Sequence, residues 1–213
     1  MDERFVNLRS TKNPKARIKM LGGHFATKNS HVNTYIDMST VKTRHNNARE
    51  TARTLAAEYM TNTMVDTIVC LKNTEMIGAF MAEALADTSN MSMSAGNNIS
   101  VVTPEFDYTG QILFRENSQR MIEGKQVIVL TDSMATGTLT MQAIESVIYY
   151  SGTVCGICAV FSSISKVAGM EVKTIFTSSD LPGYHVYSAH ECPLCDAGVK
   201  LDGIINSFGY ARL

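Results

Sequence analysis

The sequence predicts an α/β domain in which helices flank a central parallel sheet. Helical and strand hydrophobic patterns alternate through the middle of the chain, an order that favours parallel strands joined by crossover helices. The strand segments are short apolar runs, as expected for strands buried on both faces. A length of 213 residues, 45% of them hydrophobic and 18% charged, suits one globular domain or a domain with an extra lobe.

Each predicted element follows from its own pattern. In the segment 48–60, Ala48, Ala52 and Leu55 repeat at spacings of three and four, which indicates an amphipathic helix. Apolar runs indicate strands, and Gly152 stands where a helix would end. In chain order we expect a helix at 48–60, a strand at 65–71, a helix at 75–87, strands at 98–104, 111–115 and 126–130, a helix at 139–152, and strands at 154–161 and 173–177.

Composition argues against several classes of protein. The formal net charge is -1, from 19 basic and 20 acidic residues, so no overall charge favours nucleic acid or an anionic membrane. The N-terminus lacks the apolar core of a signal peptide, and no apolar run is long enough to span a membrane. Five cysteines in a chain of this length fit a reducing compartment. We therefore expect a soluble, cytoplasmic protein that binds neither nucleic acid nor membrane.

The stretch "QVIVLTDSMATGTLT" (126–140) is the strongest candidate for a binding site. A strand runs into Asp132 and then into the small-residue loop 133–138, after which a helix begins. Backbone N–H groups at such a helix start bind anions, and Gly137 lets the backbone approach closely. A carboxylate beside that loop suits hydroxyl groups or a hydrated magnesium ion better than phosphate. Together they describe a ribose 5-phosphate site; an ordinary strand-to-helix turn with Asp132 as helix N-cap is the alternative.

Four stretches resemble the type I phosphoribosyltransferases, and two of these favour the orotate branch. "VIVLTDSMATGTLT" is similar to the family motif that binds the 5-phosphate of phosphoribosyl pyrophosphate (PRPP). "DTIVCLKNTEMIGAFMAEAL" resembles the family's strand, pyrophosphate loop and helix. "HFATKNSHVNTYID" (24–37) resembles the N-terminal segment of orotate phosphoribosyltransferases, and "HECPLCDAG" resembles a segment in the tail of some of them.

The resemblance implies a particular architecture and reaction. The fold would be a type I phosphoribosyltransferase-like parallel sheet at 46–180, with a small hood built from an N-terminal segment at 1–45 and a C-terminal tail at 181–213. The chain would form a homodimer and act as a pentosyltransferase of pyrimidine biosynthesis, dependent on Mg²⁺. It would convert orotate and PRPP into orotidine 5′-monophosphate and pyrophosphate.

The resemblance also assigns site residues. Asp132 would hold the ribose hydroxyls and influence magnesium indirectly, while Lys28 and Arg115 would complete the catalytic set. Tyr35 would pack near the base. The remaining substrate-binding residues would come from the pyrophosphate loop, as Lys72, Asn73 and Thr74, and from the ribose-phosphate motif, as Thr131, Ser133, Ala135, Thr136, Gly137 and Thr138.

Two departures from the family pattern keep other functions open. Thr131 stands where the family has the first of two adjacent acidic residues, and the segment 113–125 is shorter than the family's flexible basic loop. Both favour an inactive or weakly active regulatory protein that binds PRPP or a nucleotide. Ser162 and Ser163 stand where some orotate enzymes place an arginine, so a transferase for another base is a further alternative.

The tail also has the spacing of a zinc site. Cys192 and Cys195 are separated by two residues, and His185 and His190 lie just upstream, a spacing that one zinc ion could accept. The alternative is that the "CPLC" segment is a family feature that requires no metal. The sequence leaves both open.

Overall fold

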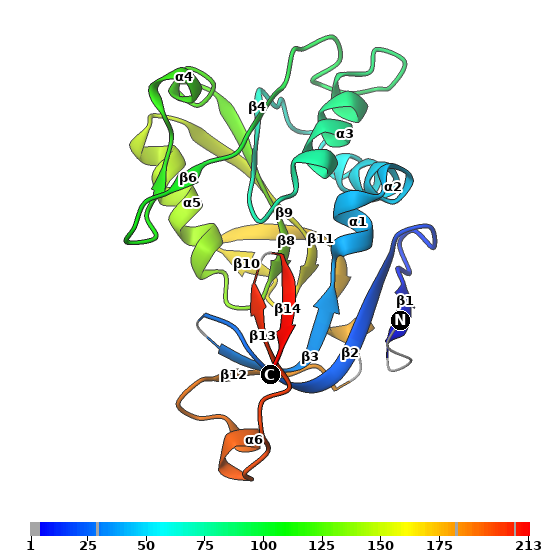
Figure 1. Cartoon of the computed structure of the whole chain (residues 1–213). Coiled ribbons are helices and arrows are strands. Elements are labelled where there is room, and N and C mark those ends of the chain that lie inside the picture. Colours follow the sequence, from blue (N-terminus) through cyan, green and yellow to red (C-terminus); the bar gives the residue numbers. More distant parts are fainter. Residues whose placement is uncertain (1–4, 29, 182, 207) are drawn as a thin grey trace.

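Two six-stranded sheets organise the molecule (Figure 1). The computed structural model describes residues 5–28, 30–181, 183–206 and 208–213. One sheet forms the α/β core, and the other joins the first strands of the chain to its last ones. Among the described helices, none combines the length and the apolar character that a membrane crossing requires.

The core sheet confirms the predicted α/β fold class. Its strands are β4 (Thr67–Cys70), β5 (Ser100–Val102), β8 (Gln126–Met134), β9 (Thr153–Ser162), β10 (Lys166–Val167) and β11 (Met170–Thr177). They lie in the order β10-β11-β9-β8-β4-β5. All neighbours are parallel except the short edge strand β10. Strands of this kind need crossover connections, which the helices of the core provide.

Helices cover both faces of the core sheet. They are α1 (Ser39–Thr43), α2 (His45–Ala56), α3 (Glu75–Ala86) and α5 (Thr138–Tyr149). Successive strand residues point to opposite faces, so Ile68 and Leu130 pack with α2 and α3, whereas Val69 and Val129 pack with α5. These strands are buried on both faces, which explains their nearly continuous apolar sequence.

The hood consists of strands from the two ends of the chain, as the fold class predicts. They are β1 (Val6–Arg9), β2 (Arg17–Ala26), β3 (Ser30–Asp37), β12 (Val186–Ser188), β13 (Gly203–Asn206) and β14 (Gly209–Arg212). β2 and β3 form an antiparallel hairpin, and β13 runs parallel to β2 with Gly203 opposite Phe25. A small core of Phe25, Tyr35 and Tyr210 lies under this sheet. The boundaries predicted at residues 45 and 180 stay predictions.

The connection between β5 and β8 differs from the predicted one. It holds a separate two-stranded hairpin, β6 (Glu105–Phe106) with β7 (Ile112–Leu113), and the short helix α4 (Glu116–Gln119). The strand predicted at 111–115 therefore pairs outside the core sheet. The short helix η1 (Ser178–Asp180) directly precedes the tail, and α6 (Pro193–Asp196) lies within it.

Candidate functional site

The strand order places a crevice beside β4 and β8. From β4 the chain crosses through α3 to β5 on one side, whereas from β8 it crosses through α5 to β9 on the other. In open α/β sheets, ligands bind outside the carboxyl ends of the strands where the order reverses in this way. The loop at 71–74 follows β4, and the loop at 135–137 follows β8. Both predicted phosphate loops therefore lie at this point.

Asp132 is a buried carboxylate held between two lysines. It lies near the end of β8, and its side chain is only 6% exposed. Lys42 Nζ donates to its Oδ2 at 2.9 Å, and Lys72 Nζ lies 3.6 Å from its Oδ1. The Ser133 hydroxyl donates to the same Oδ1 at 2.9 Å, and the Ser133 backbone N–H also donates to it. The carboxylate is thus compensated by charge and by hydrogen bonds, as its burial requires.

Lys42 is a site residue that the sequence did not indicate. It lies on α1, which directly follows hood strand β3, and its side chain is 11% exposed. Its Nζ also donates to the Lys72 carbonyl at 3.3 Å. The segment 38–44 carries no motif, so the only signal was its place between the hood strand and the first long helix of the core.

The loop after β4 has an unusual backbone. Lys72 and Asn73 both have positive φ angles, 54° and 59°. Left-handed backbone is disfavoured for residues other than glycine, and such positions concentrate at functional sites. The Lys72 side chain turns toward β8, where Nζ donates to the Ser133 carbonyl at 2.7 Å. Thr74 is fully buried and donates to the Leu71 carbonyl within the loop at 2.9 Å, and its hydroxyl lies 3.4 Å from the Leu130 carbonyl on β8.

The loop after β8 has the geometry of an anion site. Gly137 has a φ of 79° and forms the N-cap of α5, a helix long enough to carry a substantial dipole. The hydroxyls of Thr136 and Thr138 lie 3.0 Å apart at this helix start. Ser163, directly after β9, donates to the Ala135 carbonyl at 2.7 Å. Ser163 therefore holds the loop against β9, whereas the side chains of Thr136 and Thr138 are exposed at the start of α5.

Thr131 and Tyr35 are two further predicted site residues whose places the structure gives. Thr131 is 1% exposed and alternates with Asp132 along β8, so its side chain lies on the opposite face of the strand. Tyr35, on β3, packs against Tyr210 with ring centroids 4.8 Å apart. Burial raises the pKa of Tyr35, and the charges of Asp37 and Asp132 raise that pKa further. Tyr35 is therefore a member of the hood core.

Lys28 and Arg115 are the predicted residues that the described structure does not bring to Asp132. Lys28 is exposed, and its Nζ lies 3.3 Å from where a Cβ on Gly110 would stand, beside the β6–β7 turn. Arg115 Nε donates to Glu105 Oε2 at 2.7 Å. Both side chains of that pair line a cavity of about 260 Å³ beside α4. These two cations belong to the β6–β7 region rather than to the Asp132 cluster.

The predicted zinc ligands are partly wrong. Cys192 and Cys195 do lie in a group of potential metal ligands, but the histidines of that group are His24 and His31. His185 and His190 are exposed, and the His185 ring stacks on Tyr187. Proximity in sequence suggested the wrong pair, because the β2–β3 hairpin folds back against the tail.

The chain is similar in sequence and in fold to known phosphoribosyltransferases. No protein-family model matches the chain. An orotate phosphoribosyltransferase from Caldicellulosiruptor saccharolyticus is 27% identical over 142 residues, which cover 60% of this chain and 72% of that protein.

Solved structures show the same fold. The orotate phosphoribosyltransferase of Mycobacterium tuberculosis H37Rv superposes with a TM-score of 0.53 at 16% identity, over 76% of this chain and 91% of that one. The same enzyme in complex with PRPP gives a TM-score of 0.52 at 14% identity, over 68% and 82% of the two chains. An adenine phosphoribosyltransferase from Thermoanaerobacter pseudethanolicus gives 0.51 at 15% identity, over 68% and 88%.

Proposed function

We propose, from the type I phosphoribosyltransferase fold of the chain and its sequence similarity to one such enzyme, that it transfers the phosphoribosyl group of PRPP to a nitrogenous base. One observation carries the proposal: at the strand-order reversal, an anion-binding loop, a buried carboxylate and a cationic loop converge. A ribose carrying a 5-phosphate and a pyrophosphate presents the matching groups. A relative with this fold, the M. tuberculosis enzyme, has been solved with PRPP bound.

In the proposed complex, the 5-phosphate binds the loop after β8. The hydroxyls of Thr136 and Thr138 and the N-terminus of α5 supply donors without requiring a lysine. Gly137 and Ala135 keep the loop small enough for the phosphate to approach the backbone. Ser133 and Asp132 stand next along the strand, where the ribose hydroxyls would lie.

The lysines around Asp132 have a second role in this proposal. Lys42 and Lys72 neutralise the buried carboxylate in the free protein. When the ribose hydroxyls donate to Asp132, the ammonium of Lys72, which is 30% exposed, becomes available to the pyrophosphate. Asn73 and Thr74 extend the same loop. Displacement of pyrophosphate by the base requires mainly positioning and charge stabilisation from the protein.

The residues around Asp132 fit a directly bound Mg²⁺ poorly. Two ammonium groups lie within 4 Å of the carboxylate and would repel a dication, and the buried Thr131 offers no second carboxylate. We therefore propose that Mg²⁺ enters as a complex with the pyrophosphate group of the substrate. Asp132 would influence the ion only through the ribose hydroxyls.

Orotate is the base that we propose first, because the curated relative is an orotate phosphoribosyltransferase. Tyr35, from the hood, would pack near the base. Lys28 and Arg115 border the β6–β7 region away from Asp132, so they would serve the reaction across the interface of a homodimer, from one subunit to the next. The proposed products are orotidine 5′-monophosphate and pyrophosphate.

An assay with PRPP and a panel of bases tests this function. We expect turnover with orotate, and we expect Asp132→Asn to lower kcat/KM by roughly two orders of magnitude, the loss typical of one preorganised polar group at a reacting centre. Glu171→Gln is the matched control, because Glu171 pairs with Lys173 on β11 outside the crevice. Unchanged turnover in the Asp132 variant would exclude its proposed role.

A second candidate is a regulatory protein that binds PRPP or a nucleotide without useful turnover. The ion pair of Arg115 with Glu105 favours the regulatory role. Arg115 is the basic residue expected at the pyrophosphate, and in this structure a carboxylate binds its guanidinium instead. Calorimetry separates the candidates: tight binding of PRPP with no product from any base supports the regulatory role. Product from adenine or another base, but not from orotate, would support a transferase of different specificity.

A further inference from the structure

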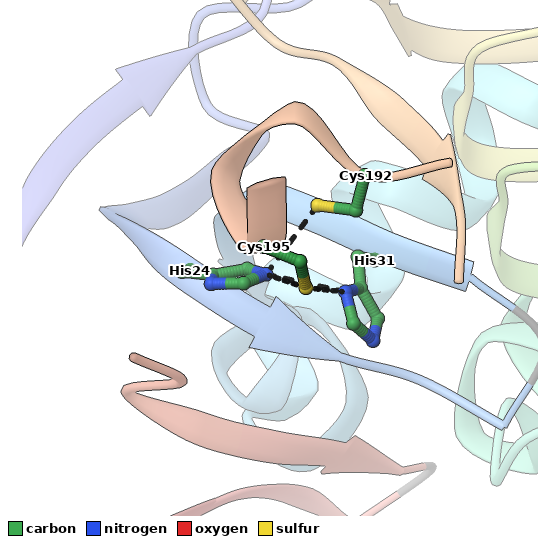
Figure 2. A group of neighbouring side chains, drawn as sticks. All are labelled: His24, His31, Cys192 and Cys195. Carbon is green, nitrogen blue, oxygen red and sulfur yellow. Dashed lines mark hydrogen bonds between the residues drawn. The ribbon is translucent and has the colours of Figure 1, made fainter. Parts of the chain in front are cut away.

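Four potential metal ligands meet between the hood hairpin and the tail. His24 lies on β2, His31 on β3, and Cys192 and Cys195 at the start of α6. One ligand atom from each lies within 4.8 Å of all the others, and Figure 2 shows the four side chains converging on one point. Figure 1 places α6 at the end of the hood away from the core helices, so this group is separate from the Asp132 crevice.

Four of the six distances between ligand atoms of the group are close to the edges of a tetrahedron around zinc, and the other two are at most 4.8 Å. Zn–S bonds of about 2.3 Å and Zn–N bonds of about 2.0–2.1 Å place tetrahedral ligand atoms roughly 3.3–3.8 Å apart. The two nitrogens, His24 Nε2 and His31 Nδ1, are 3.2 Å apart. Cys192 Sγ lies 3.5 Å from His24 Nε2, and Cys195 Sγ lies 3.7 Å from His24 Nε2 and 3.3 Å from His31 Nδ1.

The surroundings of His24 orient its free nitrogen toward this point. His24 is 1% exposed, and its Nδ1 donates to the Val199 carbonyl at 2.8 Å. A proton on Nδ1 leaves the lone pair on Nε2, the atom that faces the two sulfurs. Metal-bound histidines commonly have this kind of supporting hydrogen bond. The backbone of His24 is also held, because its N–H donates to Asp202 Oδ2 at 2.8 Å.

The start of α6 presents both sulfurs to the same side. Cys192 is the N-cap of the helix and Cys195 lies one turn later, so a spacing of three residues brings them together. Pro193 occupies the first helical position, where it stabilises the helix start. Cys192 is 1% exposed, whereas Cys195 lies at the surface, which leaves an entry path for an ion.

We propose that His24, His31, Cys192 and Cys195 bind one structural zinc ion that fastens the C-terminal tail to the β2–β3 hairpin. On binding, each thiol releases its proton to solvent, so two thiolates balance the charge of Zn²⁺ and the imidazoles bind as neutral ligands. The protein fills all four positions of the tetrahedron, which is the arrangement of a structural site rather than a catalytic one. The ion connects segments about 165 residues apart in sequence.

Metal analysis of the full-length protein tests the proposal directly. Protein purified without chelator, or loaded with ZnSO₄ and desalted, is expected to carry about one zinc per chain, released when a mercurial reagent modifies the thiols. Co²⁺ in place of zinc should give the intense visible absorption of a tetrahedral site together with sulfur-to-metal charge transfer. These two measurements need no variant, so they stand even if a substitution prevents folding.

Variants separate the proposed ligands from their neighbours. His31→Ala and Cys195→Ser are expected to lower the zinc content at least tenfold, because loss of one of four ligands weakens a structural site strongly. His190→Ala is the matched control: this histidine is exposed, close to Cys192 in sequence and outside the ligand group, so zinc content should not change.

Less than a tenth of an equivalent of zinc in loaded wild-type protein would overturn the proposal. A Cys192–Cys195 disulfide in protein kept under reducing buffer, or loss of zinc in the His190 variant alone, would overturn it as well.

Discussion

At the scale of single residues, the buried ion pair of Asp132 and Lys42 dominates the candidate site. The two side chains are 6% and 11% exposed, so removal of one leaves the other charge in a poorly solvated place. We expect Lys42→Met to lower the free energy of unfolding by roughly 2–4 kcal/mol, near the cost of breaking a buried pair. Urea denaturation measures this change.

A control pair and a double variant check the cause. Lys15 lies 3.8 Å from Glu50 and is 74% exposed, so Lys15→Met should cost less than about 0.5 kcal/mol. Adding Asp132→Asn to Lys42→Met should restore part of the lost stability, because it removes the buried charge that has lost its closest ammonium partner and keeps only the more distant Lys72. A double variant less stable than the sum of its parts would contradict the pairing.

The sequence predicted one half of this pair and missed the other. Asp132 follows an apolar strand and precedes a small-residue loop, and both features are local in sequence. Lys42 reaches Asp132, 90 residues away along the chain, only through the tertiary packing of α1 against α2 and α3. Local patterns predict strand ends well, but they carry no information on which distant side chain will compensate a buried charge.

At the scale of single elements, the loop before α5 depends on glycine at position 137. Its φ is 79°, and a Cβ there would stand 2.7 Å from Ile164 Cδ1 and 3.0 Å from Val167 Cγ2. We expect Gly137→Ala to lower the free energy of unfolding by roughly 2 kcal/mol, from backbone strain of about 1–2 kcal/mol plus the close contact. It should also weaken the binding of PRPP, measured by calorimetry.

Gly169 provides a matched control for this prediction. It has the same φ of 79°, but a Cβ there would meet nothing within 4 Å. Gly169→Ala should therefore show the backbone strain alone and leave PRPP binding unchanged. Equal losses of stability and of binding in the two variants would show that the packing around residue 137 is irrelevant to the site.

The loop after β4 allows a test of backbone strain at a functional position. Asn73 has a φ of 59°, which glycine adopts without cost and alanine does not. We expect Asn73→Gly to change the free energy of unfolding by less than about 0.5 kcal/mol and Asn73→Ala to lower it by roughly 1 kcal/mol. Thermal or urea unfolding of the two variants measures the difference, and the reverse order would exclude strain at this residue.

The elements themselves followed the sequence closely where they are buried. The helices expected at 48–60, 75–87 and 139–152 exist as α2, α3 and α5 with slightly different ends. β8 extends to Met134, four residues past its expected end, because Met134 still pairs with Ser162 on β9. Residues 131–133 are polar, so the apolar pattern did not predict this extension. Backbone pairing with β9, not apolar sequence, determines where the strand ends.

At the scale of the whole molecule, long-range pairing forms the hood, and this explains what the sequence could not predict. The family resemblance indicated that the two ends of the chain meet. It did not indicate that β13 pairs with β2, or that the β2–β3 hairpin brings His24 and His31 to the tail cysteines. Such registers depend on contacts between segments separated by most of the chain, and hydrophobic periodicity reports only on neighbours.

The last strand should matter for the hood more than its position suggests. Tyr210, on β14, packs against Tyr35, Phe25 and Phe5 with ring centroids 4.8, 5.8 and 6.5 Å away. We expect Tyr210→Ala to lower stability by roughly 2–3 kcal/mol, through lost burial and lost aromatic contacts. For a chain of this length, that corresponds to a decrease in Tm of roughly 5–10 °C.

Phe208 is the control for Tyr210, because it lies two residues away and is 86% exposed. Phe208→Ala should leave Tm within about 1–2 °C of the wild type, as expected for a surface substitution. Hydrogen exchange localises the effect: in Tyr210→Ala, amides of β13, β14 and the adjacent end of β2 should exchange faster, while those of β8 and β9 stay protected. If the core strands lost protection to the same degree, the hood and the core would unfold as one cooperative unit, and the packing of Tyr210 against Tyr35 would stabilise the sheet that carries Asp132 as well as the hood.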